Sequence, residues 1–146
     1  KNMKKIVLAF SLLAYSAISS AQVTVPKVNT QGTESSLKNF VKPPAIGDVG
    51  KTTNGITDML GSKLSLSSDQ KSKLTDAVSG FLTKKKDISG LADTNPTDYV
   101  SKFNPMQKGL FGKMKGIMGA STFTKFLGMK PSGSKIAGNP LSNLFF

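Results

Sequence analysis

The sequence contains no cysteine, no histidine, no tryptophan and no arginine. Without cysteine it forms no disulfide and no thiolate metal site, so a folded domain depends on its own hydrophobic core. Without histidine and cysteine it also lacks the side chains that most often serve as general bases and nucleophiles. The single glutamate is Glu34, and the aspartates are scattered singly along the chain. We therefore expect a protein that is not an enzyme and that binds no metal and no other cofactor.

The absence of arginine also limits the class of partner. All 20 basic residues are lysine, and the formal net charge is +12. Arginine is the side chain that forks onto phosphates and base edges, so its absence argues against specific nucleic-acid recognition. Scattered lysines supply at most a weak, salt-sensitive attraction to an anionic surface. We expect the partner to be a protein client or an anionic membrane surface, and the oligomeric state stays open.

Long apolar runs are few, and the clearest one lies at the N-terminus. Three lysines precede the apolar residues 6–15, and small residues follow as far as Ala21. A basic start, a short apolar stretch and a small-residue site are the three parts of a secretory signal peptide. The run is shorter than the roughly 20 residues of a membrane span. We expect residues 1–21 to be a signal peptide and the protein to be exported to the periplasm or the extracellular space.

Residues 22–53 are rich in Pro, Gly, Ser and Thr and show neither helical nor strand periodicity, so they are expected to form a flexible leader. Within this leader, AIGDVGKT matches a relaxed phosphate-binding loop pattern that ends in Gly50, Lys51 and Thr52. Such a loop needs a buried strand before it and a helix directly after it. Two adjacent prolines disfavour the strand, and no helix is expected before Asn54. We interpret the match as chance and expect no nucleotide binding.

Residues 54–130 carry helical signals and form the expected domain. The clearest helix covers residues 66–88, where apolar side chains recur with helical spacing at Leu74, Ala77, Val78, Phe81 and Leu82. At its start, Ser67 and Gln70 have the spacing of a capping box, in which each side chain bonds a backbone amide of the first turn. Asp69 and Lys73 are spaced for an ion pair along the same helix.

Four further features divide the rest of this domain. A short amphipathic segment precedes the strong helix and is interrupted at Gly61. The pairs Asn95-Pro96 and Asn104-Pro105 each predict a helix start, because proline is favoured at the first helical position. A break near Gly119 separates off a final helix with Phe123, Phe126 and Leu127. We predict an all-α fold, a small bundle of four to five short helices with a disordered leader and a disordered C-terminal tail. The tail is residues 131–146, whose apolar end is able to dock onto the bundle.

The segment MQKGLFGKMKGIMG offers a candidate surface for a partner or a membrane. Its apolar residues fill one arc of a helix, glycines lie on the opposite side, and lysines flank the arc. Interior glycines weaken a helix, so packing or a lipid surface has to order it. The arc serves either as core or as a binding surface, since it cannot do both at once. The candidate surface residues are Met106, Lys108, Leu110, Phe111, Lys113, Met114, Lys115, Ile117 and Met118.

The stretch LSSDQ, residues 66–70, resembles the L-T-x-x-Q signature of Spy-like periplasmic chaperones, with Ser67 in place of the threonine. The resemblance implies a basic, all-helical protein without enzymatic activity that shields unfolded clients on a concave surface. The single copy of the motif and the short predicted helices depart from that family. The N-terminal region also resembles small secreted proteins of Bacteroidota-type bacteria. Two functions follow as expectations: an exported interaction or chaperone-like module, or a membrane-surface protein that inserts the helix near residues 105–119.

Overall fold

A computed structural model describes residues 40–146, and the expected signal peptide lies outside this part of the chain. Within residues 40–146 the protein has helices and no strand, which confirms the predicted all-α class. The helices are α2 (Val49–Leu64), α3 (Ser68–Ile88), α4 (Leu91–Thr94), α5 (Pro96–Met118), α6 (Ala120–Leu127) and α7 (Ser142–Phe145), with one 3-10 turn, η1 (Gly133–Lys135).

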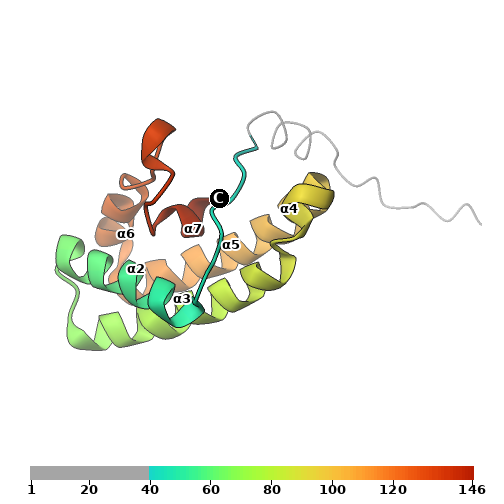
Figure 1. Cartoon of the computed structure of the whole chain (residues 1–146). Helices are drawn as coiled ribbons and strands as arrows, with labels where there is room; N and C mark the ends of the chain where they lie inside the picture. Colours follow the sequence, from blue (N-terminus) through green and yellow to red (C-terminus); the bar gives the residue numbers. More distant parts are fainter. Residues whose placement is uncertain (1–39) are drawn as a thin grey trace, which may run out of the picture.

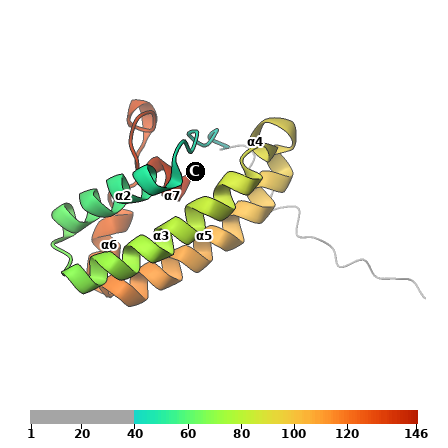
Figure 2. The same cartoon turned by 60° about the horizontal axis from the view of Figure 1, so that its bottom comes forward.

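The two longest helices, α3 and α5, run antiparallel and form one layer of the molecule, with α4 at the end where they connect (Figure 1). Helices α2, α6 and α7 lie on one side of this pair, and the view in Figure 2 shows the same two layers. Helix α3 has 21 residues, close to the helix predicted over residues 66–88, whereas α5 has 23 residues and is longer than either helix predicted in its place. The core fills the space between the two layers.

Helix α3 forms as predicted because its local signals agree. The Ser67 hydroxyl accepts a hydrogen bond from the Gln70 amide at 3.2 Å, and the Gln70 side chain accepts one from the Ser67 amide at 3.0 Å. The capping box is therefore complete. The predicted ion pair between Lys73 and Asp69 forms at 2.8 Å on the exposed side. The predicted apolar stripe faces the core, where Ala77 is half-buried and the buried members are Leu74, Val78, Phe81 and Leu82.

The predicted helix start at Asn104-Pro105 is wrong, because α5 runs through it without interruption from Pro96 to Met118. Proline inside a helix removes one backbone hydrogen bond and leaves a carbonyl without its partner. Here Pro105 and Ser101, the residue four positions earlier, are both exposed, so water can reach that carbonyl. Burial of Tyr99 and Phe103 before the proline and of Leu110 after it ties both halves to the same core. Tertiary packing overrides the local stop signal.

The first helix begins earlier than expected, at Val49 rather than at Asn54. Asp48 caps it, since its carboxylate accepts a hydrogen bond from the Lys51 amide at 2.7 Å. The expected interruption at Gly61 is also absent, and α2 continues to Leu64. A Cβ at Gly61 would lie 3.4 Å from the aliphatic part of Lys71 on α3, which is an ordinary van der Waals contact, so the packing of α2 on α3 does not depend on glycine at this position.

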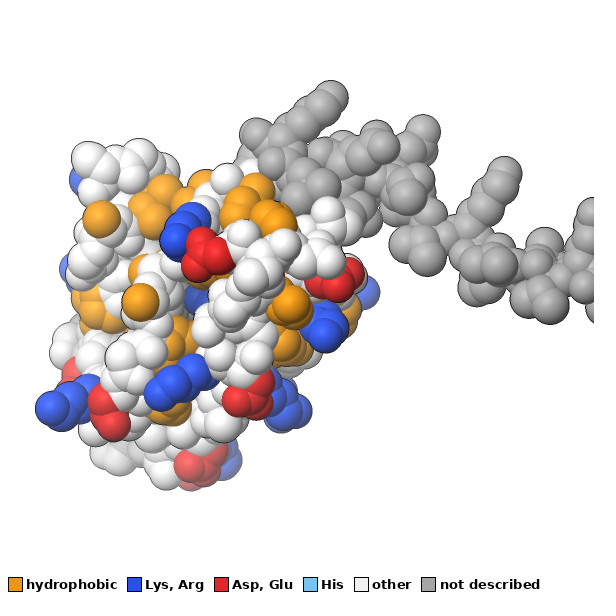
Figure 3. Space-filling view, turned by 45° about the vertical axis from the view of Figure 1, so that its right-hand side comes forward, with side chains coloured by type: hydrophobic (Ala, Val, Ile, Leu, Met, Phe, Trp, Pro, Cys, Tyr) orange, Lys and Arg blue, Asp and Glu red, His pale blue; other side chains and the backbone are white. Residues whose placement is uncertain are grey.

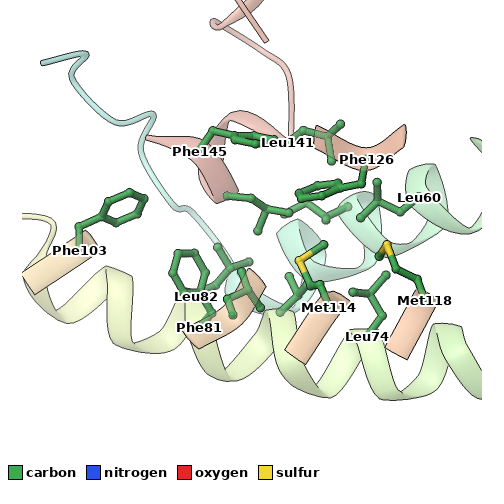
Figure 4. Packing of buried hydrophobic residues seen from close by; sticks show 14 of the residues in the cluster. Leu60, Leu74, Phe81, Leu82, Phe103, Met114, Met118, Phe126, Leu141 and Phe145 are labelled. Carbon is green, nitrogen blue, oxygen red and sulfur yellow. The ribbon is translucent and has the colours of Figure 1, made fainter. Parts of the chain in front are cut away.

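The C-terminal tail was predicted to be disordered, but its last residues pack into the core. Leu141 and Leu144 are buried, and Phe145 stacks on Phe126 of α6 with ring centroids 5.1 Å apart. Figure 4 shows Leu141 and Phe145 close to Phe126 and on the same side of the core. The apolar end of the chain therefore docks onto the bundle and covers one side of the core.

The break predicted near Gly119 is confirmed, since Gly119 separates α5 from α6 with a φ of 81°. Side chains other than glycine rarely adopt that conformation.

A side chain at Gly116, by contrast, would meet nothing within 4 Å. We predict that Gly116→Ala raises the free energy of unfolding by about 1 kcal/mol, because alanine is the better helix former. Gly119→Ala is expected to lower it by about 1–3 kcal/mol, because φ 81° with ψ 159° is a backbone region that is almost restricted to glycine. Urea unfolding of both variants checks this, and stabilisation by both would contradict the assigned turn.

Candidate functional site

The structure divides the predicted candidate surface into three groups. The buried residues belong to the core, and they are Leu110, Met114 and Met118. The half-buried residues are Met106, Phe111 and Ile117. The exposed residues are Lys108, Lys113 and Lys115. The apolar arc therefore packs inside the protein, and only its flanks reach the surface.

One of these flanks borders an apolar groove between α5 and α6, which we call the α5–α6 groove. Its volume is about 480 Å³. It is lined by Asn104, Gln107, Lys108, Phe111, Gly112, Lys115, Phe123 and Leu127. The predicted surface contributes Lys108, Phe111 and Lys115 to it, whereas Phe123 and Leu127 were predicted only as members of the last helix.

Helical spacing explains why these side chains meet. Lys108, Phe111 and Lys115 stand at i, i+3 and i+7 on α5, which places them along one side of the helix. Phe123 and Leu127 stand at i and i+4 on α6 and form a second row. The turn at Gly119 brings α6 back against α5, so the two rows face the same groove.

The floor of the groove is a packed aromatic cluster. The ring of Phe111 meets those of Phe123 at 5.9 Å, Phe126 at 5.5 Å and Phe145 at 5.5 Å, each edge to face. Such pairs hold one another in place and add to the energy of burial. Leu127 at the edge is 42% exposed. Among the large hydrophobic side chains of residues 40–146, it is the one that is exposed rather than buried or half-buried. The groove thus offers a preformed apolar surface.

The exposure of Leu127 does not follow from the sequence pattern of α6 alone. Phe126 and Leu127 are adjacent on α6, and neighbouring positions on a helix point about 100° apart. Adjacent positions can both be buried, as Phe81 and Leu82 of α3 are, but on α6 the core takes only Phe126, which is fully buried. Sequence reasoning grouped the two residues together and so missed the surface position of Leu127.

Charge is distributed unevenly along the chain. Residues 99–146 contain no acidic residue and seven lysines, which are Lys102, Lys108, Lys113, Lys115, Lys125, Lys130 and Lys135. In residues 40–98 the charges almost balance, and Figure 3 shows a face on which Lys and Asp side chains lie interspersed. The ion pairs found within residues 40–146 join Lys42, Lys71 and Lys73 to aspartates, so none neutralises a lysine of the later half. Lys108 and Lys115 therefore give the groove a positive rim.

The groove is also tied to the docked end of the chain. The side-chain amide of Gln107, one of the groove residues, donates a hydrogen bond to the Leu144 carbonyl at 2.8 Å. Phe145 lies below Phe111 in the aromatic cluster. The C-terminal segment thus supports the floor of the groove from the inside, and no periodicity in the sequence predicts this contact.

A second unusual group is the buried amine of Lys85 on α3, which is 1% exposed. Its Nζ donates to the Asn143 carbonyl at 2.9 Å and lies 5.5 Å from the centre of the Phe103 ring. No carboxylate of residues 40–146 forms an ion pair with it. Desolvation by burial lowers the pKa of Lys85 to about 7. No pattern in the sequence marks Lys85 as part of the core.

The phosphate-binding loop pattern does not have the geometry of such a loop. Gly50, Lys51 and Thr52 lie inside the first turn of α2, and residues 40–48 before it form no strand. The Asp48 carboxylate accepts a hydrogen bond from the Lys51 amide, so a negative group already stands at the helix start where a phosphate would bind. This arrangement fits the interpretation of the match as chance.

Residues 40–146 hold no cluster of three acidic side chains that could ligate a metal ion. In the same part of the chain, no helix combines the length and the apolar character needed to cross a bilayer. No protein family, curated protein or solved structure matches this chain.

Proposed function

We propose that this chain is an exported, non-enzymatic binding module that holds apolar segments of protein clients, in the manner of a chaperone. The observation that carries the proposal is the α5–α6 groove, with Phe111 and Phe123 in its wall and Leu127 exposed at its edge. Each Å² of apolar surface that a client covers there contributes about 25 cal/mol of transfer free energy, before the costs of association and of ordering the client are subtracted. An exposed apolar groove with a polar rim is typical of a partner-binding site.

The depth of the groove supports a protein client. Phe111 and Phe123 are half-buried rather than enclosed, so the groove is shallow and open along its length. Sites for small molecules usually bury most of the ligand surface in a deep pocket. Short predicted helices were one difference from the Spy-like family. The antiparallel pair of α3 and α5 is long, so this difference is smaller than the sequence suggested.

Leu127→Lys tests the function. The substitution places a charge in the groove at an exposed position, so we expect the fold to persist and the suppression of client aggregation to fall several-fold. The assay follows light scattering of a chemically unfolded client protein diluted into buffer with the full chain. Ala137→Lys is the matched control, because Ala137 is exposed and lies outside the groove. Equal activity of both variants and the unsubstituted protein would contradict the assignment of the groove.

The second candidate is a membrane-surface protein, favoured by the excess of lysine in residues 99–146. Lysines near an anionic bilayer contribute about 1 kcal/mol each. For the apolar arc of α5 to enter lipid, however, Leu110 and Met114 would have to leave the core. Co-sedimentation with phosphatidylglycerol vesicles and with neutral vesicles at physiological salt decides between the two. Retention on the anionic vesicles alone would favour the membrane function, and no retention on either would favour the client-binding module.

A further inference from the structure

We propose that the segment held in the α5–α6 groove is an acidic amphipathic helix of a partner protein. The inference rests on the proposed function, since it names the chemistry of the partner for the same groove. Three features of the structure lead to it: the unneutralised charge of the rim, the spacing of the two rim lysines, and the shape of the apolar floor between them.

The charge selects an acidic partner. Lys108 and Lys115 are exposed, and neither forms an ion pair within residues 40–146. The region from Tyr99 onward has no acidic residue, so no carboxylate of that region competes for them. Complementary charge at the rim of an interface speeds association and selects partners. An acidic segment is attracted to this side of the molecule, and a basic segment is repelled from it.

The spacing selects a helix. Lys108 and Lys115 are seven residues apart on α5, a separation of about 10.5 Å along the helix axis. A partner helix that lies along the groove presents carboxylates at the same separation when they stand at i and i+7. Apolar side chains at i+3 and i+4 of that helix then fall between the carboxylates, above Phe111.

The floor matches such an apolar stripe. Phe111 lines the groove from α5, and Phe123 and Leu127 line it from α6. Because Phe123 and Leu127 are one helical turn apart, the apolar surface extends along the axis of α6. Gly112 also lines the groove, and nothing lies within 4 Å of the place where its side chain would be. Leucine-sized side chains on a partner helix therefore find apolar surface over about one helical turn, between the two rim lysines.

Three fluorescent peptides of roughly 18 residues, long enough to populate a helix, test the proposal. The acidic peptide carries leucines with helical spacing and glutamates at i and i+7. In the basic peptide lysines replace the glutamates, and the scrambled peptide keeps the acidic composition without the helical spacing. Fluorescence anisotropy at about 0.15 M salt measures binding to the full chain, where long-range attraction is largely screened.

The doubly substituted protein Lys108→Glu, Lys115→Glu is compared with the matched control Lys63→Glu, Lys84→Glu, which makes the same change of net charge at exposed positions outside the groove. We expect the unsubstituted protein to prefer the acidic peptide to both others. The groove variant should bind the acidic peptide about tenfold more weakly and the basic peptide more tightly than the unsubstituted protein does. The control should change either affinity by less than about threefold.

Equal losses in the groove variant and the control would overturn the inference, because net charge alone would then explain the binding. Equal affinity for the acidic and scrambled peptides would also overturn it, because no helix would be recognised. If the acidic peptide fails to bind while the protein still suppresses client aggregation through Leu127, the inference fails and the proposed function stands. Circular dichroism of both substituted proteins confirms that each keeps the helical fold.

Discussion

Replacing Phe126 by alanine is expected to lower the free energy of unfolding by about 3–5 kcal/mol. Phe126 is fully buried, and its ring lies against Phe111 of α5, Phe123 of α6 and Phe145 of α7. The substitution removes the central ring of this cluster and leaves a cavity that the helices cannot fill without moving. It also removes the surface on which the C-terminal segment docks, so hydrogen exchange of residues 141–146 should become faster.

Urea denaturation of the full chain, followed by circular dichroism, measures the loss. Phe123→Ala is the matched control, because the same side chain is removed from a half-buried position one turn away on α6. We expect the control to lose less than about half as much stability, since less of its surface leaves contact with the core. Equal losses for the two variants would contradict the central position of Phe126, and a loss below about 1 kcal/mol for Phe126→Ala would show that the aromatic cluster does not organise the bundle.

The stability of the protein is expected to rise with pH between about 7 and 10, because the amine of Lys85 is buried. Its pKa is about 7 in the folded protein, against a usual value of 10.5 that applies to the unfolded chain. Between these values the unfolded chain binds one more proton than the folded protein does. The penalty for burying the amine is therefore complete below pH 7 and is relieved as the pH rises toward 10.5. The slope reaches about 1.4 kcal/mol per pH unit.

Tyr99 sets the upper limit of this window. Burial raises the pKa of Tyr99 above its usual value of 10.0, so above that pH the hydroxyl ionises in the unfolded chain first. This effect has the opposite sign and lowers the stability of the folded state. Measurements between pH 7 and pH 10 therefore report on Lys85.

Lys85→Met should abolish the rise, because methionine keeps most of the buried volume and carries no proton. At pH 7 the variant is expected to be as stable as the unsubstituted protein or more so by up to about 4 kcal/mol, since apolar replacement of a buried charge is often neutral or stabilising. Urea denaturation at four pH values across the window measures both slopes. Lys84→Met, at an exposed neighbouring position, is the control and should keep the slope. An unchanged slope in Lys85→Met would contradict the assigned burial of the amine.

Helix α3 could be predicted because all of its signals are local. Its cap is a contact between Ser67 and Gln70, and its stripe follows from helical spacing alone. Pro105 shows the limit of such reasoning, since a strong local stop signal lies inside α5. Whether a helix continues through proline depends on the tertiary packing before and after it, which the local sequence does not contain.

The candidate site was predicted only in part for the same reason. Helical spacing correctly placed the apolar residues of α5 on one side of the helix, but it could not show which of them are buried in the core. Lys108 and Lys115 were found because they flank that arc, whereas Leu127 acquires its exposure from the way α6 folds back at Gly119. The docking of the apolar C-terminus was predicted from its composition, but the contacts of Leu144 and Phe145 beneath the groove could not be, because a four-residue helix has no period to detect.

The most direct test of the groove as the binding surface is a titration of the full, isotope-labelled chain with an unfolded client, followed by nuclear magnetic resonance. We predict that the chemical-shift changes gather on Phe111, Phe123 and Leu127 and on the amides of Lys108 and Lys115, while the signals of Leu110 and Met114 stay in place. Changes centred on Leu110 and Met114 instead would mean that the bundle opens to bind through its core. That result would contradict the assignment of the α5–α6 groove.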